Sequence, residues 1–95
     1  MSNPTKQEKL NDLYELLAGI TNVQDCKALL DDLCTVKEVE NMAERVYAAR
    51  LLLEGQTYNA IIQQADISSA TLSRVSRCVQ YGSGYRRLLK KPENG

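Results

Sequence analysis

The chain has 95 residues, of which 43% are hydrophobic and 25% are charged, and its formal net charge is zero. This length suits one small domain and is too short for two hydrophobic cores. No apolar run approaches the roughly 20 residues of a membrane span, and no signal-peptide pattern opens the chain. We therefore expect a cytoplasmic protein without a membrane partner.

Metal and catalytic chemistry find little support in the composition. The three cysteines, Cys26, Cys34 and Cys78, form no CxxC pair, and histidine is absent. A zinc site would then need an unusual ligand set, so we expect no metal site and three buried thiols in a reducing compartment. An enzyme is not predicted either, because no Gly-rich phosphate loop and no nucleophile with an identifiable base is present.

The zero net charge hides an asymmetry along the chain. Residues 1–66 carry a formal charge of −5, from six Lys or Arg against eleven Asp or Glu. Residues 67–95 carry +5, from six Lys or Arg against one Glu. Each phosphate that a cation neutralises releases condensed counterions, so the basic part favours phosphate binding. A solvated basic tail is the alternative.

Hydrophobic periodicity predicts two helices in the first third of the chain. The first runs from Thr5 to about Ala18 and is ended by Gly19. The second runs over Val23–Leu33, with Asn22 as its N-cap. The apolar positions are Leu10, Leu13, Tyr14, Leu16, Leu17 and Ile20 in the first helix, and Cys26, Leu29, Leu30 and Leu33 in the second.

The longest predicted helix runs from about Val36 to Glu54. Thr35 and Glu38 match the capping box Thr-x-x-Glu at its start, and Gly55 suits its C-terminal stop. Apolar residues extend more than halfway round this helix, which is typical of a helix buried on several sides. So short a chain lacks the surface to cover it, and we expect a second copy to do so in a homodimer.

The stretch over about residues 57–79 predicts a helix-turn-helix, which places its second helix in a DNA major groove. The first helix would begin after the N-cap Thr57 and run to about Ala65. Asp66 stands where such turns often need the left-handed region, which Asp tolerates better than most residues. Ile67 is expected to plug the turn as a buried side chain.

Ser68 can cap the second helix, which is predicted from Ser69 to about Val79. Leu72 and Val75 share its apolar face with Val79. The opposite face offers small hydroxyls and two forked cations, which reach phosphates and base edges. We assign DNA contacts to Ser68, Ser69, Ala70, Ser73, Arg74 and Arg77. The alternative is a surface hairpin whose polar side chains are only solvated.

After Val79, the run Gln80-Tyr81-Gly82-Ser83-Gly84 is expected to break the helix, and a short last helix is expected from Tyr85 to Lys90. Residues from Pro92 onward are expected to be disordered, and we find no strand pattern or repeat. The predicted fold class is therefore all-α, with about six helices in one domain over residues 1–95.

The segment CTVKEVENMAERVYAARLLLEGQTYNAIIQQADISSATLSRVSRCVQ resembles the core of the tryptophan repressor (TrpR) family. The run Tyr81-Gly82-Ser83-Gly84-Tyr85 behind it is most similar to the TrpR-related YerC/YecD subgroup. The resemblance covers roughly Leu33 to Leu89. It implies an intertwined homodimer of the Trp repressor type, whose two helix-turn-helix heads read a double-stranded DNA operator, with transcriptional repression as the role.

The resemblance also implies an effector site. Many members of the family bind L-tryptophan between the long helix and the recognition helix. By the motifs AERVY and TLSRVSR, Arg45 and Arg74 fall on the two arginines that sandwich the indole. Thr35 falls on the threonine that helps to hold the carboxylate, and Thr71 matches another threonine of the pocket. Guanidinium planes stack on aromatic faces and fork onto carboxylates, so these residue types suit such a ligand.

Two positions depart from the tryptophan-binding pattern. Val75 replaces a small glycine beside the ligand, and Cys78 replaces a serine that helps to hold the amino group. A thiol is a weaker hydrogen-bond partner than a hydroxyl. L-tryptophan, another small co-regulator and no effector at all therefore stay open.

The function predicted from the sequence is a dimeric, sequence-specific DNA-binding transcriptional regulator, with effector gating left open. The alternative is a helical module that turns the same basic face toward an acidic protein or RNA. Changing both Arg74 and Arg77 to Glu separates the two, because a partner complex of the module type would survive the loss of DNA binding.

Overall fold

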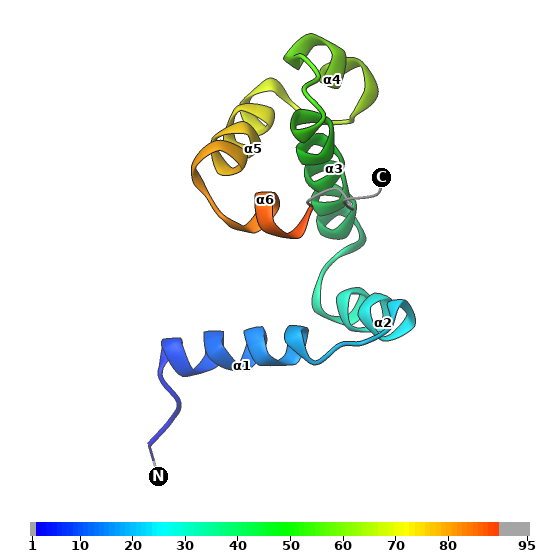
Figure 1. The fold of residues 1–95 in the computed structure, drawn as a ribbon. Coiled ribbons are helices and arrows are strands. Elements are labelled where there is room, and N and C mark those ends of the chain that lie inside the picture. Colours follow the sequence, from blue (N-terminus) through cyan, green and yellow to red (C-terminus); the bar gives the residue numbers. More distant parts are fainter. Residues whose placement is uncertain (1, 90–95) are drawn as a thin grey trace. The chain divides into compact units, whose positions relative to one another are not determined.

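The computed structural model describes residues 2–89, and over that range the chain is built from helices without a strand (Figure 1). The helices are α1 (Lys6–Ala18), α2 (Val23–Leu33), α3 (Val36–Leu53), α4 (Tyr58–Gln64), α5 (Ser69–Tyr81) and α6 (Gly84–Leu88). The all-α class with six helices is thus confirmed. The last helix begins one residue before the predicted Tyr85 and ends at Leu88, short of the predicted Lys90. The expected disorder from Pro92 lies outside the described residues.

Contacts divide the chain into two compact units, Met1–Val36 and Lys37–Gly95. The first unit holds α1 and α2, and both begin at the side-chain caps that their sequences provide. Asn22 accepts from the backbone N–H of Asp25 at 2.8 Å, as expected for α2. In α1, Thr5 is the N-cap rather than the first helical residue. Its hydroxyl accepts from the N–H of Glu8, whose carboxylate accepts from the N–H of Thr5, a capping box that the sequence reading missed.

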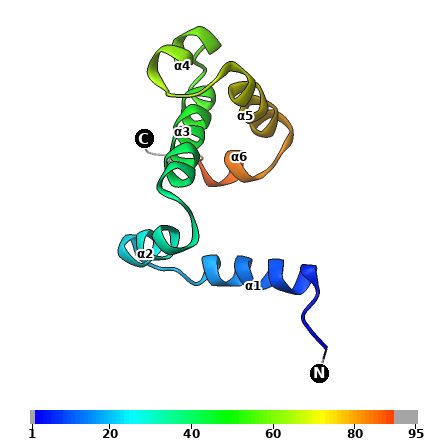
Figure 2. The same cartoon turned by 180° about the vertical axis from the view of Figure 1, so that it is seen from behind.

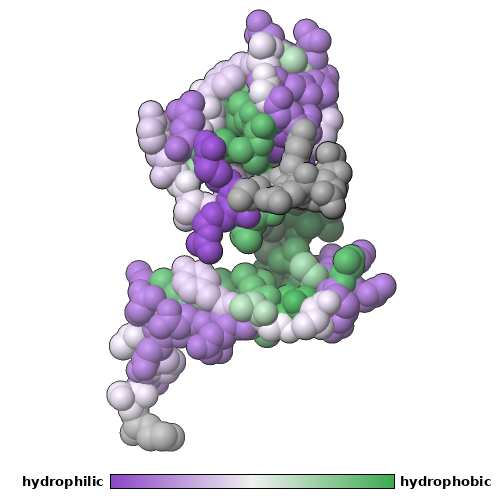
Figure 3. Space-filling view, in the orientation of Figure 1, coloured by the Kyte–Doolittle hydropathy of each residue, from purple (hydrophilic) through white to green (hydrophobic). Residues whose placement is uncertain are grey.

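The apolar stripes of α1 and α2 are largely uncovered. Neither helix contains a buried residue. Tyr14 is 56% exposed, Leu16 51% and Leu33 54%, and Figure 3 shows apolar residues gathered on the surface of these helices. Stripes of this kind mark a face that packs against another surface. Within the first unit, α1 and α2 therefore do not bury their apolar residues against each other.

The second unit holds the core. In Figures 1 and 2, α5 and α6 lie along one side of α3, and α4 follows at its C-terminal end. Ala48 and Ala49 of α3 are fully buried, because their small side chains let the neighbouring helices approach closely. One buried cluster comprises Ala48, Leu51, Ile61, Ala65 and Leu72, and a second comprises Ala49, Val75 and Val79.

The end of α3 explains the direction of the chain that follows it. Gly55 has a φ of 89°, the left-handed conformation that glycine adopts without strain. Its N–H donates to the carbonyl of Leu52 at 3.0 Å, and the N–H of Gln56 donates to the carbonyl of Leu51 at 3.1 Å. This is a Schellman motif, so Gly55 acts as the predicted stop. The capping box expected from Thr35 and Glu38 stays a prediction.

Candidate nucleic-acid interface

The first helix of the predicted helix-turn-helix forms, but its turn differs from the prediction. Thr57 caps α4 by accepting from the N–H of Ala60 at 3.2 Å. Asp66 was expected in the left-handed region, and that expectation is wrong, because no described residue other than glycine has a positive φ. The chain instead leaves α4 through extended backbone at Ala65, with φ −111° and ψ 145°. The N–H of Asp66 then donates to Oε1 of Glu44 at 2.9 Å.

The second helix, α5, begins where the sequence predicts. The hydroxyl of Ser68 accepts from the N–H of Thr71 at 3.1 Å, which satisfies one of the donors left free at a helix start. Ile67, expected as a buried plug, is half-buried and packs against both clusters of the core. The turn is therefore fixed to the core by an apolar side chain as well as by hydrogen bonds.

The two faces of α5 are clearly separated by burial. Leu72, Val75 and Val79 are between 0% and 6% exposed and face the core. The six candidate DNA-contacting residues are all exposed: Ser68, Ser69, Ala70, Ser73, Arg74 and Arg77. Because they lie at the start or on the outer face of a single helix, they form one surface that a duplex groove could receive.

The charged side chains of α5 and of the described segment behind it are all positive. Residues 67–89 contain Arg74, Arg77, Arg86 and Arg87 and no acidic residue. Nε of Arg86 donates to the carbonyl oxygen of Val79 at 3.1 Å. That bond holds one cation against the last turn of α5, where carbonyls lack helical partners. An anionic partner on the outer face of α5 would therefore meet Arg74 and Arg77, and neither α5 nor α6 contributes a competing carboxylate.

Sequence reasoning missed one residue of this surface. Helix α5 ends at Tyr81 rather than at the predicted Val79, and the ring of Tyr81 is 84% exposed. Tyr81 lines a shallow hollow of about 440 Å³ together with Arg74 and Arg77. The spacing of Tyr81 from these arginines, at i+7 and i+4, was the available signal.

The candidate effector residues are only partly brought together. Arg45 and Thr71 line a small polar cavity of about 150 Å³ beside the turn. Arg74 lines the separate hollow on the outer face of α5, and Thr35 belongs to the other compact unit. Val75 is 2% exposed and packs with Ala49 and Val79, so its side chain fills the space between α5 and α3.

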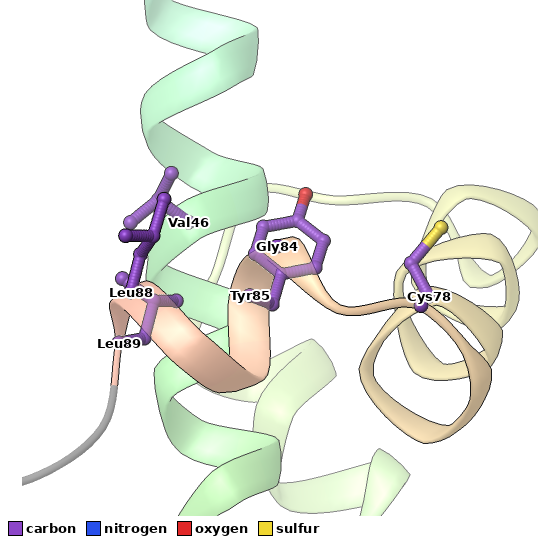
Figure 4. Close-up of a pocket in the computed structure, with 7 residues that line it drawn as sticks. Val46, Cys78, Gly84, Tyr85, Leu88 and Leu89 are labelled. Carbon is purple, nitrogen blue, oxygen red and sulfur yellow. The ribbon is translucent and has the colours of Figure 1, made fainter.

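A second, apolar cavity of about 470 Å³ lies between α3, α5 and α6 (Figure 4). Tyr85 and Leu88 of α6 and the following Leu89 line it opposite Val46 of α3, with Cys78 of α5 at its side. Leu88 is 83% exposed. Among residues 2–89, no charged residue lines this cavity, and its described lining suits apolar packing rather than a phosphate.

Three further expectations can be compared with the described residues. The three cysteines are free but half-buried, not buried as expected. Within residues 2–89, no group of three or more His, Cys, Asp or Glu side chains could hold a metal ion. A membrane span would need a longer and more apolar helix than any that the structure describes.

Comparisons with known proteins agree with this geometry. The family model described as Trp repressor protein matches residues 8–93 of the chain. The uncharacterized protein YerC of Bacillus subtilis (strain 168) is 38% identical over 76 residues, which cover 80% of this chain and 73% of YerC.

Two solved structures also superpose well. A candidate Trp repressor from Staphylococcus aureus has a TM-score of 0.81 at 35% identity, covering 85% of this chain and 82% of its own. A TrpR-like protein from Eubacterium eligens ATCC 27750 has a TM-score of 0.83 at 29% identity, covering 90% of this chain and 89% of its own.

Proposed function

The chain belongs to the Trp repressor family, and from this premise we propose that it is a transcriptional repressor that binds a specific DNA operator as a homodimer. Family membership itself indicates a helix-turn-helix DNA-binding regulator. The observation that carries the proposal is the orientation of α5. Its Ser68-capped start, Arg74 and Arg77 face outward, while Leu72 and Val75 anchor it to the core.

In this proposal α5 is the recognition helix. Ser69 and Ala70 are small, so the start of the helix can approach the base edges closely. A recognition helix contacts bases mainly through its N-terminal residues, and its other polar residues contact phosphates. Arg74 and Arg77 follow on the same face, where each can pair with a phosphate or bond a guanine with two hydrogen bonds.

The homodimer is supported by the apolar surface that one copy leaves exposed. Helices α1 and α2 bury none of their residues, and Val46, Tyr47 and Leu88 are 37%, 42% and 83% exposed in the second unit. A second copy would cover these residues and would complete one domain over residues 1–95. It would also present two recognition helices to half-sites about one helical turn, or roughly 34 Å, apart.

We further propose that DNA binding does not require L-tryptophan. Val75 already fills the space between α5 and α3. Arg45 and Arg74, the pair expected to sandwich an indole, line different cavities. Heating the protein with a panel of amino acids and nucleobases tests this, because a ligand of the native state raises the melting temperature by mass action. We expect no shift with L-tryptophan, and a shift would assign it as the co-regulator.

Selection from a pool of random DNA duplexes tests the main proposal. We expect enrichment of a palindrome whose half-sites are about 10 base pairs apart, bound by two chains. The variant with both Arg74→Glu and Arg77→Glu should enrich nothing while keeping its helical circular dichroism. A pool that yields no palindrome, with binding that is independent of salt, would refute operator binding.

A further inference from the structure

One hydrogen bond ties the turn of the helix-turn-helix to the long helix α3. Oε1 of Glu44 accepts from the backbone N–H of Asp66 at 2.9 Å, between residues 22 positions apart in the sequence. Asp66 lies between α4 and α5, directly before Ile67 and the N-cap Ser68. Glu44 is half-buried on α3. The contact therefore joins the body of the second unit to the segment that starts the recognition helix.

The Glu44 carboxylate accepts from an N–H that follows the last helical hydrogen bond of α4. The N–H of Ala65 closes the last helical bond of α4 by donating to Ile61 at 2.8 Å, and the chain then becomes extended. The N–H of Asp66 lies beyond that ladder, and the Glu44 carboxylate satisfies it from α3. A hydrogen bond to an ionised acceptor is shorter and stronger than one between neutral groups.

Apolar side chains also join α5 and the turn before it to α3. Val75 packs with Ala49, and Ile67 packs against both core clusters. This packing restricts how α5 crosses α3, because interdigitated side chains favour particular crossing angles within a range of about 15–20°. A hydrogen bond has a preferred angle and a narrow range of distance, so it can fix the tilt of α5 within that range. Glu44 supplies this directional contact at the turn.

We infer that Glu44 is a positioning residue, whose carboxylate fixes the orientation of α5 relative to α3 and so sets the affinity for DNA. The inference rests on the proposed function. Two recognition helices in a dimer must match two half-sites at once. A dimer in which α5 samples several tilts can therefore bind the operator for only part of the time. The apparent affinity falls in proportion to that competent fraction.

Three variants of the full chain test the inference, with the selected duplex as the probe. Glu44→Ala removes the acceptor, and Glu44→Gln keeps an acceptor oxygen at the same reach. Glu40→Gln is the charge control, because Glu40 is exposed one turn earlier on the same helix. We expect Glu44→Ala to bind about tenfold more weakly than Glu40→Gln, the loss that a charge-assisted hydrogen bond accounts for.

Two readouts separate positioning from general stability. Because Glu44→Ala removes no phosphate contact, its affinity should fall while the slope of log affinity against log salt stays that of the wild type. Glu44→Gln should recover most of the affinity. Equal affinity of Glu44→Ala and Glu40→Gln would overturn the inference, and so would an equal loss in Glu44→Ala and Glu44→Gln.

Amide hydrogen exchange without DNA tests the contact independently of the proposed function. The Asp66 amide should exchange slowly in the wild type and faster in Glu44→Ala, while amides in the middle of α5 keep their protection. A wild-type chain that binds no duplex but protects Asp66 would refute the proposed function and leave the contact established. Fast exchange at Asp66 in the wild type would refute the positioning role itself.

Discussion

Replacing both outward arginines of α5 with glutamine should weaken DNA binding without destabilising the fold. Arg74 and Arg77 are exposed, and α5 and α6 contain no acidic residue, so the change breaks no ion pair within those helices. Exposed substitutions of this kind change the free energy of unfolding by about 0.5 kcal/mol or less. The melting temperature of the variant should therefore stay close to that of the wild type.

The effect on DNA binding follows from the number of phosphates that are lost. Each neutralised phosphate contributes about 0.9 to the slope of log affinity against log salt. Two arginines per chain, present twice in a dimer, would lower that slope by about 3.6 if all of them contact phosphates. An arginine that bonds a guanine would instead cost about 1–3 kcal/mol on the matched sequence and leave the slope nearly unchanged.

Fluorescence anisotropy on the selected duplex between about 50 and 200 mM salt separates these outcomes. Arg50→Gln is the matched control, because it makes the same change at an exposed position of α3. The account predicts a loss of affinity for the double variant and near wild-type binding for Arg50→Gln. Unchanged slope and affinity in the double variant would refute the assignment of α5 as the DNA-contacting helix, and so would an equal loss in the control.

Three further predictions concern the fold. Leu72→Ala removes a fully buried side chain and should lower the free energy of unfolding, measured in urea, by about 2–5 kcal/mol. An unchanged urea midpoint of unfolding would place Leu72 outside the core. Gly82→Ala would place a Cβ 2.8 Å from the carbonyl oxygen of Cys78, so thermal melting should show a loss of about 1–3 kcal/mol, and a gain in stability would contradict this packing. The pKa of Lys27 is raised from 10.5 by its hydrogen bond to Asp31 and by the charge of that carboxylate. The Lys27–Asp31 pair therefore stabilises the folded chain fully below the ordinary lysine pKa, and this stabilisation is lost as pH rises through the raised pKa of Lys27. The difference in melting temperature between the wild type and Lys27→Gln should accordingly become smaller in alkaline solution.

Local signals in the sequence were sufficient for most helix boundaries. The bounds Val23–Leu33 were predicted correctly at both ends. Asn22 marks the start of this helix, because its side-chain cap depends only on neighbouring residues. Ser68 and Gly55 mark the start of α5 and the end of α3 for the same reason. The burial of Leu72 also followed from periodicity, since one face of an amphipathic helix must meet the core.

The parts that the sequence did not predict depend on contacts between distant residues. Asp66 was expected in the left-handed region because its local preference allows that conformation. The backbone of Asp66 instead has a negative φ, and its N–H donates to Glu44, 22 positions earlier in the chain. The extension of α5 to Tyr81 was missed because Val79 is the last apolar position of the periodic pattern, and the run from Gln80 to Gly84 was expected to break the helix. For the effector candidates, a motif can align Arg45 and Arg74 but cannot show that they line different cavities.

Titration of the isotopically labelled chain with the selected duplex, followed by amide chemical shifts, tests the central claim most directly. The account predicts that the largest shift changes fall on the start and outer face of α5, at Ser69, Ala70, Ser73, Arg74 and Arg77. Amides of α1 and α2 should change little when the dimer is already formed. Largest changes on α1 or α2, with the amides of α5 unmoved, would contradict the account.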